Sequence, residues 1–597
     1  MRNKRKAEWS GGLFDRTAHR NLLMDYLIMV AALVAFALLI FALEGGRAKK
    51  AEKEFVDKLR EGYLKLADKK YALERYEKIK SYYLRHEKDG QIDDITWNDL
   101  GMDEIFKRMN YTLSASGEEY LYYKLRTLYQ RNEELEHFEK VVNAFGKHRD
   151  ERVRFLFRMN KLGYTGKYSL YDYIDNLDYL GERSNLKNYI CDLLFLPLIA
   201  MLWVKFQIGI VGLVVLMIYN IITYFKEKNE IDPYITSFAY IIRLLSVCDE
   251  VEKLKLAGCE AELESIRLHK RNMQALRRNS FWVMSAGNSR AGAASGDIIG
   301  VFMDYIRMVF HADLIKFNRM LSVLRGHIED VDALISTVGY LETAVSVWIF
   351  RQSLENGWCL PEFIGEERVG LRDAYHPLLE KPVKNTIISE RGVLLTGSNA
   401  SGKSTFLKTV AINAILAQTI HTCTADEYRA PFFYVYSSMA LRDDIGSGES
   451  YYIVEIKALK RILDAAASGK RPVLCFVDEV LRGTNTVERI AASTQILKSL
   501  GGAGIFCFAA THDIELTELL REYYDNYHFE EDVRDGDISF NYRLQQGKAT
   551  TRNAIKLLGL MGYDDEIVSR ALASAEYFMK TGMWREEPYE RKRNNAG

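Results

Sequence analysis

Long runs of apolar residues are the most distinctive part of the hydrophobic pattern. Residues 26–43 are eighteen consecutive residues without a charge, close to the length that crosses the hydrocarbon core of a bilayer. Four basic residues among the first six also fit a signal peptide, but this apolar run is long for one and no small-residue cleavage site follows it. We therefore predict that residues 1–43 form a basic tail and a transmembrane helix.

A second apolar stretch, residues 189–225, predicts a membrane hairpin with its turn near Lys205. Its second part, 206–225, is uncharged and long enough to span alone, whereas the first part contains Asp192 and Pro197 and is marginal. The alternative is a buried helix pair in a soluble core. Residues 208–218 are apolar on every face, whereas a surface helix would carry a polar stripe, so we favour the membrane hairpin.

Outside these runs, charged and apolar residues recur at helical spacing. Residues 44–90, rich in Lys, Glu, Leu and Tyr, predict a helical stalk. Residues 91–188 and 226–364 predict two further helical segments. The last residues, 581–597, predict a polar tail.

A different pattern begins near residue 365. Short β-rich runs at 392–396, 473–477 and 504–509 are apolar throughout and are separated by helical stretches. Strands that are buried on both faces and alternate with helices are typical of a mostly parallel sheet. We predict an α/β domain over residues 365–580.

Charge and cysteine content change this picture little. Lys plus Arg and Asp plus Glu both number 81, so a nucleic-acid surface would have to be local. A basic cluster at residues 266–278 is a candidate phosphate-contacting surface, and a solvated helix face is the alternative. The seven cysteines are scattered without a CxxC pair, which predicts no zinc site and fits a reducing compartment.

The strongest chemical motif follows the first β-rich run of the α/β domain. Residues 397–404, GSNASGKS, match the phosphate-binding pattern GxxxxGK[ST] in full. They lie between a predicted strand and a predicted helix. Lys403 is expected to reach the β- and γ-phosphates of ATP, and Ser404 to ligate Mg²⁺. The expected nucleotide contacts are Gly397, Ser398, Asn399, Ala400, Ser401, Gly402, Lys403, Ser404 and Thr405.

Two further motifs complete a predicted ATPase site. Asp478 and Glu479 end the next β-rich run, as expected if Asp478 holds Mg²⁺ and Glu479 polarises the attacking water. His512 follows the third run and is expected to sense the γ-phosphate. A Gly- and Ser-rich segment with Ser450 precedes a helix, which predicts a second anion-binding element of the kind that ABC-class ATPases supply from a partner subunit.

These motifs, in this order and spacing, resemble the ATPase domain of the MutS family of DNA mismatch-repair proteins. The matching segments are HPLLE (376–380), TGSNASGKSTFLKTVAINAILAQ (396–418), DDIGSGESYYIVEI (443–456), VLCFVDEVLRGTNTVER (473–489), ATHDIEL (510–516) and TRNAIKLLGL (551–560). Residues 103–128 also resemble the start of the family's helical core. This resemblance implies that residues 91–188 and 226–364 are two parts of that core, the second with its lever helices. The resemblance implies that Ser450 contacts the nucleotide of a second subunit and that residues 484–486 lie at the dimer interface.

The sequence also departs from the family pattern. The loop interior is Ser-Asn-Ala-Ser where the family usually has Pro-Asn-Met-Gly, although Asn399 is kept. The family's Ser-Thr-Phe is Ser450-Tyr451-Tyr452. In place of the family's N-terminal mismatch-reading domain, which carries a Phe-x-Glu motif, the first ninety residues hold an apolar segment. We therefore expect neither long clamp arms, for which there is too little room, nor a nuclease domain after the ATPase domain.

The sequence therefore predicts an α/β P-loop ATPase domain of ABC-like fold, preceded by a mostly α-helical core with transmembrane helices. We expect a membrane-anchored homodimer that hydrolyses ATP with Mg²⁺ on the cytoplasmic side. One hypothesis couples hydrolysis to DNA binding, and the other is a membrane mechanochemical or scaffolding ATPase without mismatch recognition. A solute-transporting ABC protein would need more spans and an LSGGQ-type signature. An SMC-type ATPase would need a long coiled coil between Lys403 and Asp478.

Overall fold

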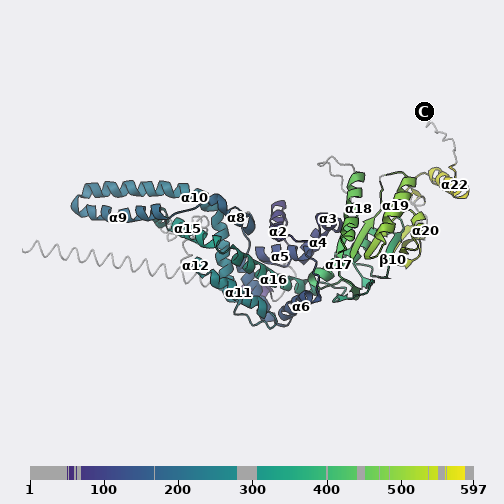
Figure 1. Ribbon diagram of the computed structural model, residues 1–597, viewed down its shortest axis with the longest axis horizontal. Coiled ribbons are helices and arrows are strands. Elements are labelled where there is room, and N and C mark those ends of the chain that lie inside the picture. Colours follow the sequence, from purple (N-terminus) through teal and green to yellow (C-terminus); the bar gives the residue numbers. More distant parts are fainter. Residues whose placement is uncertain are drawn as a thin grey trace, which may run out of the picture.

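A computed structural model of the protein has an elongated shape (Figure 1). A helical hairpin lies at one end, a helical core in the middle and an α/β domain at the other end. The structure describes residues 50, 53–59, 62, 69–166, 168–277, 305–398, 401–439, 451–469, 471–482, 484–534, 537–548, 555, 558–559 and 561–584. The predicted transmembrane helix at 26–43 lies outside the described residues and stays a prediction.

The helical core is built from both of the predicted helical segments. Its helices are α2 (Leu73–Arg85), α3 (Asp94–Leu100), α4 (Met102–Met109), α5 (Ala115–Arg126), α6 (Asn132–Lys147), α7 (Arg149–Leu162), α8 (Leu170–Asp175), α11 (Glu260–Asn272), α12 (Gln274–Arg277), α15 (Ala312–Arg325) and α16 (Ile328–Gln352), with a 3₁₀ turn at Leu177–Leu180. Helices α5 and α16 cross closely because glycines lie at the crossing. A Cβ atom on Gly339 would lie 2.6 Å from the carbonyl oxygen of Ser116, and Gly117 faces the Glu342 carboxylate.

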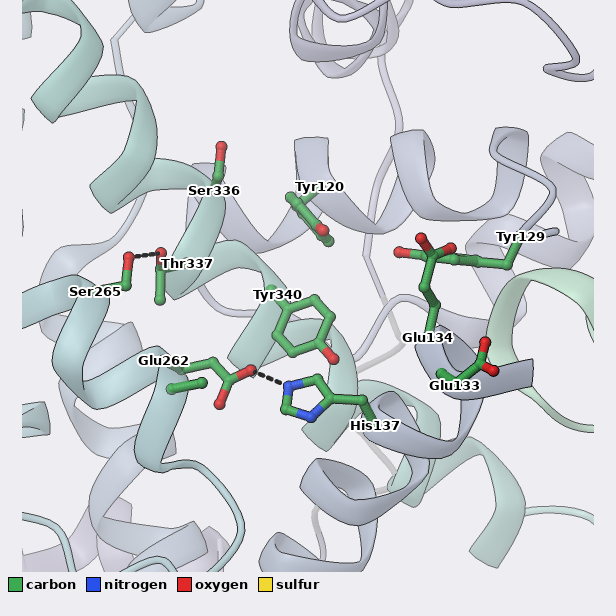
Figure 2. Close-up of a pocket in the computed structure, with 11 residues that line it drawn as sticks. Tyr120, Tyr129, Glu133, Glu134, His137, Glu262, Ser265, Ser336, Thr337 and Tyr340 are labelled. Atoms are coloured by element: carbon green, nitrogen blue, oxygen red, sulfur yellow. Dashed lines mark hydrogen bonds and ion pairs between the residues drawn. The ribbon is translucent and has the colours of Figure 1, made fainter. Parts of the chain in front are cut away.

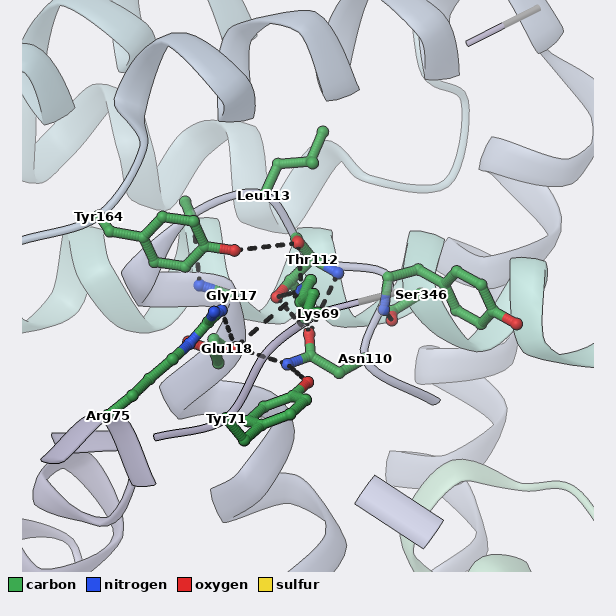
Figure 3. Close-up of polar contacts among 12 residues, drawn as sticks. Lys69, Tyr71, Arg75, Asn110, Thr112, Leu113, Gly117, Glu118, Tyr164 and Ser346 are labelled. Atoms are coloured by element: carbon green, nitrogen blue, oxygen red, sulfur yellow. Dashed lines mark hydrogen bonds and ion pairs between the residues drawn. The ribbon is translucent and has the colours of Figure 1, made fainter. Parts of the chain in front are cut away.

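The second half of residues 44–90, for which a helical stalk was predicted, packs into the helical core. Helix α2 packs on α5 because Ile79, Tyr82 and Tyr83 lie on one face of the helix and are buried in the core. A buried polar network also holds this segment, and Figure 3 shows it around Glu118. Arg75 donates two hydrogen bonds to Glu118, at 2.7 and 3.2 Å, so the segment that leaves the predicted anchor belongs to the core.

The apolar hairpin consists of α9 (Leu186–Val204) and α10 (Phe206–Val251), which meet at Lys205, the residue at which the sequence placed the turn. The apolar hairpin is long and hydrophobic enough to cross a membrane, and only 11% and 22% of the most apolar windows of its helices are buried. Helix α10 does not end near residue 225 but continues into the core, where Phe238, Ile241 and Leu244 are buried. The apolar stretch is therefore continuous with the core.

Helix α16 also has the length and composition of a membrane span, but 72% of its most apolar window is buried. It packs against α5, α6 and α11 and forms the centre of the helical core. Its hydrophobicity is thus explained by protein contacts, whereas that of the apolar hairpin is not.

The α/β domain contains two sheets. The six-stranded sheet has the order β10-β9-β4-β8-β7-β6, and all of its neighbouring pairs are parallel except β10–β9. Its strands are β4 (Gly392–Thr396), β6 (Tyr434–Ser438), β7 (Val473–Asp478), β8 (Ile505–Ala510), β9 (Tyr524–Arg534) and β10 (Asp537–Gln546). The three strands predicted from apolar runs are β4, β7 and β8, and they lie side by side at the centre of this sheet.

The second sheet was not predicted from the sequence. It has the order β1-β5-β2-β3, formed by β1 (Glu362–Phe363), β2 (Val369–Ala374), β3 (Asn385–Ser389) and β5 (Glu427–Ala430). Its strands are short and partly exposed, so they lack the continuous apolar pattern of the central strands. The helices of the domain are α17 (Lys403–Ile420), α18 (Tyr451–Ala467), α19 (Thr486–Leu500), α20 (Glu515–Leu519) and α22 (Asp565–Thr581).

Candidate nucleotide site

The predicted phosphate loop connects the end of β4 to the first residue of α17, Lys403. Its glycines are required by the backbone: Gly397 has φ +141° and Gly402 has φ +108°, where a side chain would be strained. A Cβ atom on Gly397 would also lie 2.9 Å from the carbonyl oxygen of Phe529. The loop thus brings backbone N–H groups to the N-terminus of a helix, which favours an anion.

Lys403 lies over this loop. Its amino group donates hydrogen bonds to the carbonyl oxygens of Gly397 at 2.8 Å and Ser398 at 2.7 Å. The Ser401 hydroxyl beside it is buried and has no hydrogen-bond partner among the described residues. A buried polar atom without a partner is costly, so a ligand that hydrogen-bonds here would stabilise the loop.

Ser404 and Asp478 come from α17 and the end of β7, and the Ser404 hydroxyl donates to Oδ2 of Asp478 at 2.5 Å. Burial raises the pKa of Asp478, although the hydrogen bond from Ser404 opposes this shift. A hydroxyl and a carboxylate oxygen in contact are the ligand types that Mg²⁺ prefers, together with phosphate oxygens. The residues present therefore fit a magnesium ion.

Glu479 is held in a strained turn directly after β7, with φ +59°, which is uncommon for a residue other than glycine. Its carboxylate lies 2.7 Å from Nε2 of His512 and 3.0 Å from Nε of Arg482. The hydrogen bond from His512 lowers the pKa of Glu479, so this carboxylate stays ionised. Two predicted catalytic residues from different strands are thus in direct contact.

Neighbouring side chains fix the positions of these two residues. The buried carboxylate of Glu455 on α18 accepts the N–H of Leu481 at 2.5 Å and so holds the turn after Glu479. Asp513, next to His512, pairs with both Nε and one terminal nitrogen of Arg489 on α19, at 2.9 and 2.7 Å. The sequence motifs contained these positions but gave no sign of their positioning role.

A cavity of about 320 Å³ adjoins the phosphate loop and contains Gly402 and Thr405. Its other walls include His376, Phe529 and Tyr542, and a Cβ atom on Gly402 would lie 3.1 Å from the Tyr542 ring. Burial lowers the pKa of His376 to about 4, so its imidazole is neutral at pH 7. The motif analysis missed Tyr542, because no pattern in the sequence connects a β10 residue to the loop.

Some predicted residues are not placed with the others. Asn399, Ala400 and Ser450 lie outside the described residues, so their predicted roles stay predictions. Asn485, predicted at the dimer interface, is the N-cap of α19, where its side chain accepts the N–H of Glu488 at 3.0 Å. The cap gives Asn485 a local structural role and does not test its exposure to a second subunit.

The α/β domain thus carries Lys403, Ser404, Asp478, Glu479 and His512 at one edge of its six-stranded sheet. The model of MutS domain V matches residues 393–579, which include all of these residues. The similarity to MutS proteins thus covers this C-terminal domain of the chain.

Curated relatives agree over the same part of the chain. The DNA mismatch repair protein MutS of Pseudothermotoga lettingae is 31% identical over 230 residues, which cover 37% of this chain and 28% of the relative. MutS of Thermus thermophilus is 30% identical over 226 residues, covering 37% of this chain and 27% of the relative. MutS of Thermus aquaticus is 31% identical over 222 residues, with 36% and 27% covered. The chain thus matches less than a third of the length of these relatives.

Proposed function

We propose that the protein is an ATP hydrolase that binds ATP with Mg²⁺ at the edge of the six-stranded sheet. The observation that carries the proposal is the meeting of Ser404, Asp478, Glu479 and His512, from three different segments, beside the glycine-rich loop. The match to MutS domain V supports it, since the matched residues contain this whole group.

Each residue has a distinct role in this proposal. Lys403 exchanges its loop carbonyl contacts for phosphate oxygens, and Ser404 with Asp478 holds Mg²⁺, which neutralises charge on the phosphates. Glu479 accepts a proton from the attacking water, and His512 orients Glu479. The cavity lined by His376, Phe529 and Tyr542 is the proposed place for the base and sugar, because apolar and aromatic walls suit a planar ring.

The test is hydrolysis of ATP by the full chain and by two variants. We expect Glu479→Gln to reduce kcat by about 100-fold or more while ATP binding remains, because binding and proton transfer use different groups. Glu566→Gln, which makes the same change at an exposed glutamate of α22 outside the catalytic group, is the matched control. Undiminished hydrolysis by Glu479→Gln would contradict the assignment of Glu479.

We also propose that the site is completed in a homodimer, with Ser450 of a second subunit approaching the nucleotide. The support is the family resemblance of the segment that contains Ser450. With ATP bound, Glu479→Gln is expected to be trapped as a dimer, which light scattering coupled to size-exclusion chromatography would detect. A variant that remains monomeric in ATP would exclude the composite site.

Membrane attachment by the apolar hairpin is the next part of the proposal. The surfaces of α9 and α10 carry exposed apolar side chains such as Leu193, Val211 and Val215. A continuous exposed apolar surface is unfavourable in water. Helix α9 alone is about 28 Å long, close to the thickness of a bilayer core. In this arrangement the helical core and the ATPase domain lie on one side of the membrane, the cytoplasmic side.

DNA binding is one candidate for the work that hydrolysis drives. MutS relatives are named for DNA mismatch repair, but the basic cluster gives this chain little support. Arg267 pairs with Glu252 and Glu264, and Lys270 pairs with Asp249 and Glu252. These pairs favour the solvated helix face over a surface that is free to contact phosphates.

The second candidate is a membrane mechanochemical or scaffolding ATPase without mismatch recognition. The Phe-x-Glu pattern that the family's mismatch-reading domain carries is present at residues 225–227 of this chain. These residues lie in α10, at the base of the apolar hairpin. Together with the ion pairs of Arg267 and Lys270, this position favours the second candidate. Binding of the solubilised protein to duplex, mismatched and branched DNA across salt concentrations separates the two, because specific binding survives salt that abolishes phosphate contacts.

A further inference from the structure

The helical core contains a larger cavity, of about 550 Å³, between α5, α6, α11 and α16. Its described lining includes three carboxylates, Glu133, Glu134 and Glu262, with one imidazole, His137, and no Lys or Arg. Figure 2 shows Glu262, His137 and Tyr340 turned toward one another on one side of the cavity. The cavity therefore carries negative charge that its own walls do not balance.

Glu262 is the most unusual of these carboxylates because it is only 8% exposed. Its Oε1 lies 2.7 Å from Nε2 of His137, while Oε2 is buried and has no hydrogen-bond partner among the described residues. An imidazole carries a full positive charge only when it is protonated. A buried carboxylate with this single partner is under-neutralised, and such a group is stabilised by a cation.

Aromatic rings form the rest of the wall. Tyr120 and Tyr340 pack edge to face with their centroids 6.1 Å apart, and Tyr129 completes the set. Burial raises the pKa of all three phenols, so the rings remain neutral at physiological pH. The face of a tyrosine ring attracts an ammonium or guanidinium group.

The amino group nearest these rings belongs to Lys124, which lies 3.6 Å from the centroid of Tyr129 and 5.7 Å from that of Tyr340. Lys124 is fully buried and does not line the cavity. Burial lowers the pKa of Lys124 strongly.

We propose that this cavity binds an organic cation that carries a primary ammonium group. Glu262 is its counter-ion, Tyr340 and Tyr129 form its wall, and Glu133 and Glu134 attract it at the exposed rim. The site is independent of the ATP site proposed above. It adjoins the ATPase domain nonetheless, since the N–H of Tyr129 donates to the carbonyl oxygen of Gln418 in α17 at 2.8 Å.

The ammonium group can come from a free amine or from a lysine side chain of another polypeptide. Calorimetric titration of the full chain in detergent with cadaverine and with N-acetyl-lysine methylamide compares these two sources, and pentanediol is the neutral control. We expect saturable binding of the ammonium compounds and none of the diol. Whichever of the two amines binds more tightly identifies the source of the ammonium group. Absence of binding by both amines, or equal binding of the diol, overturns the proposal.

Variants assign the binding to this cavity. Glu262→Gln is expected to weaken cadaverine binding at least about tenfold, because it removes the counter-ion. Glu264→Gln is the matched control: it lies on the same helix, its side chain is 68% exposed, and it does not line the cavity. Equal affinity of the two variants overturns the assignment.

Three further variants keep the proposal testable if Glu262→Gln does not fold. The double variant Glu133→Gln/Glu134→Gln changes only exposed positions in the first turn of α6, and we expect it to bind several-fold more weakly. Tyr340→Phe keeps the ring and is expected to retain binding, whereas Tyr340→Leu is expected to lose it. If the double variant and Tyr340→Leu both bind like the unmodified chain, the proposal fails.

Discussion

Nε2 of His512 lies 2.7 Å from Oε1 of Glu479, although the two residues follow different strands of the sheet. This contact is the largest influence on the pKa of Glu479, which it lowers against the opposing effect of burial. A carboxylate that is meant to accept a proton must be ionised at the working pH. The contact therefore makes a prediction about the pH dependence of hydrolysis.

His512→Asn is expected to shift the acid limb of the pH–kcat profile to higher pH. Without the imidazole, the pKa of Glu479 rises toward its ordinary value or above it, because burial then acts with less opposition. A larger fraction of Glu479 is then protonated at a given acidic pH, so a smaller fraction can accept a proton from water. An unchanged acid limb, with kcat reduced equally at every pH, would show that His512 acts in another way.

The contact between Ser404 and Asp478 predicts a change in metal dependence. Asp478→Asn replaces an anionic oxygen donor with a neutral amide, so the Mg²⁺ concentration needed for half-maximal hydrolysis is expected to rise by about tenfold or more. Burial already raises the pKa of Asp478, and for this reason the unmodified enzyme should also lose Mg²⁺ affinity at acidic pH. Titration of hydrolysis with Mg²⁺ at fixed ATP measures both effects. Equal Mg²⁺ dependence in the variant would place the metal elsewhere.

The central sheet was predictable from the sequence because its strands are buried on both faces, so β4, β7 and β8 read as continuous apolar runs. The phosphate loop, Asp478 and His512 could then be located at the ends of those strands. The second sheet and Tyr542 were not predictable, since half-exposed strands lack that pattern and the approach of β10 to Gly402 depends on tertiary contacts. Glu262 was missed because a helical glutamate is usually solvated, and only the fold encloses it.

The exposed apolar hairpin predicts that Trp203 lies in lipid or at its interface. This residue is 90% exposed and is next to the turn at Lys205. In vesicles of brominated lipids, which quench nearby indole fluorescence, Trp203→Phe should lose part of the quenchable signal. Trp97→Phe is the control, because Trp97 is 1% exposed in the core. If the signal lost with Trp203 responds to a water-soluble quencher and not to the lipids, the apolar hairpin lies outside the membrane.

Glu342 predicts a pH dependence of stability. Burial raises its pKa to about 7 in the folded protein, despite hydrogen bonds from Ser114 and from the N–H of Leu113. Between the ordinary pKa of a glutamate and about 7, the folded state therefore binds a proton that the unfolded state has lost. The contribution of this group to the free energy of unfolding falls as pH rises through that window. Glu342→Gln should flatten the fall in melting temperature between pH 5 and pH 7.5, and an equal fall in both proteins would contradict this.

The same carboxylate limits what can replace Gly117. A Cβ atom on Gly117 would lie 2.0 Å from Oε2 of Glu342, and Glu342 is fully buried between α5 and α16. The side chain cannot move away without breaking its hydrogen bonds, so Gly117→Ala is expected to destabilise the protein by about 2 kcal/mol or more. Gly365→Ala is the control, since a Cβ atom there would meet nothing within 4 Å. Thermal unfolding measures both, and a variant at Gly117 as stable as the control would mean that the two helices separate more easily than their packing indicates.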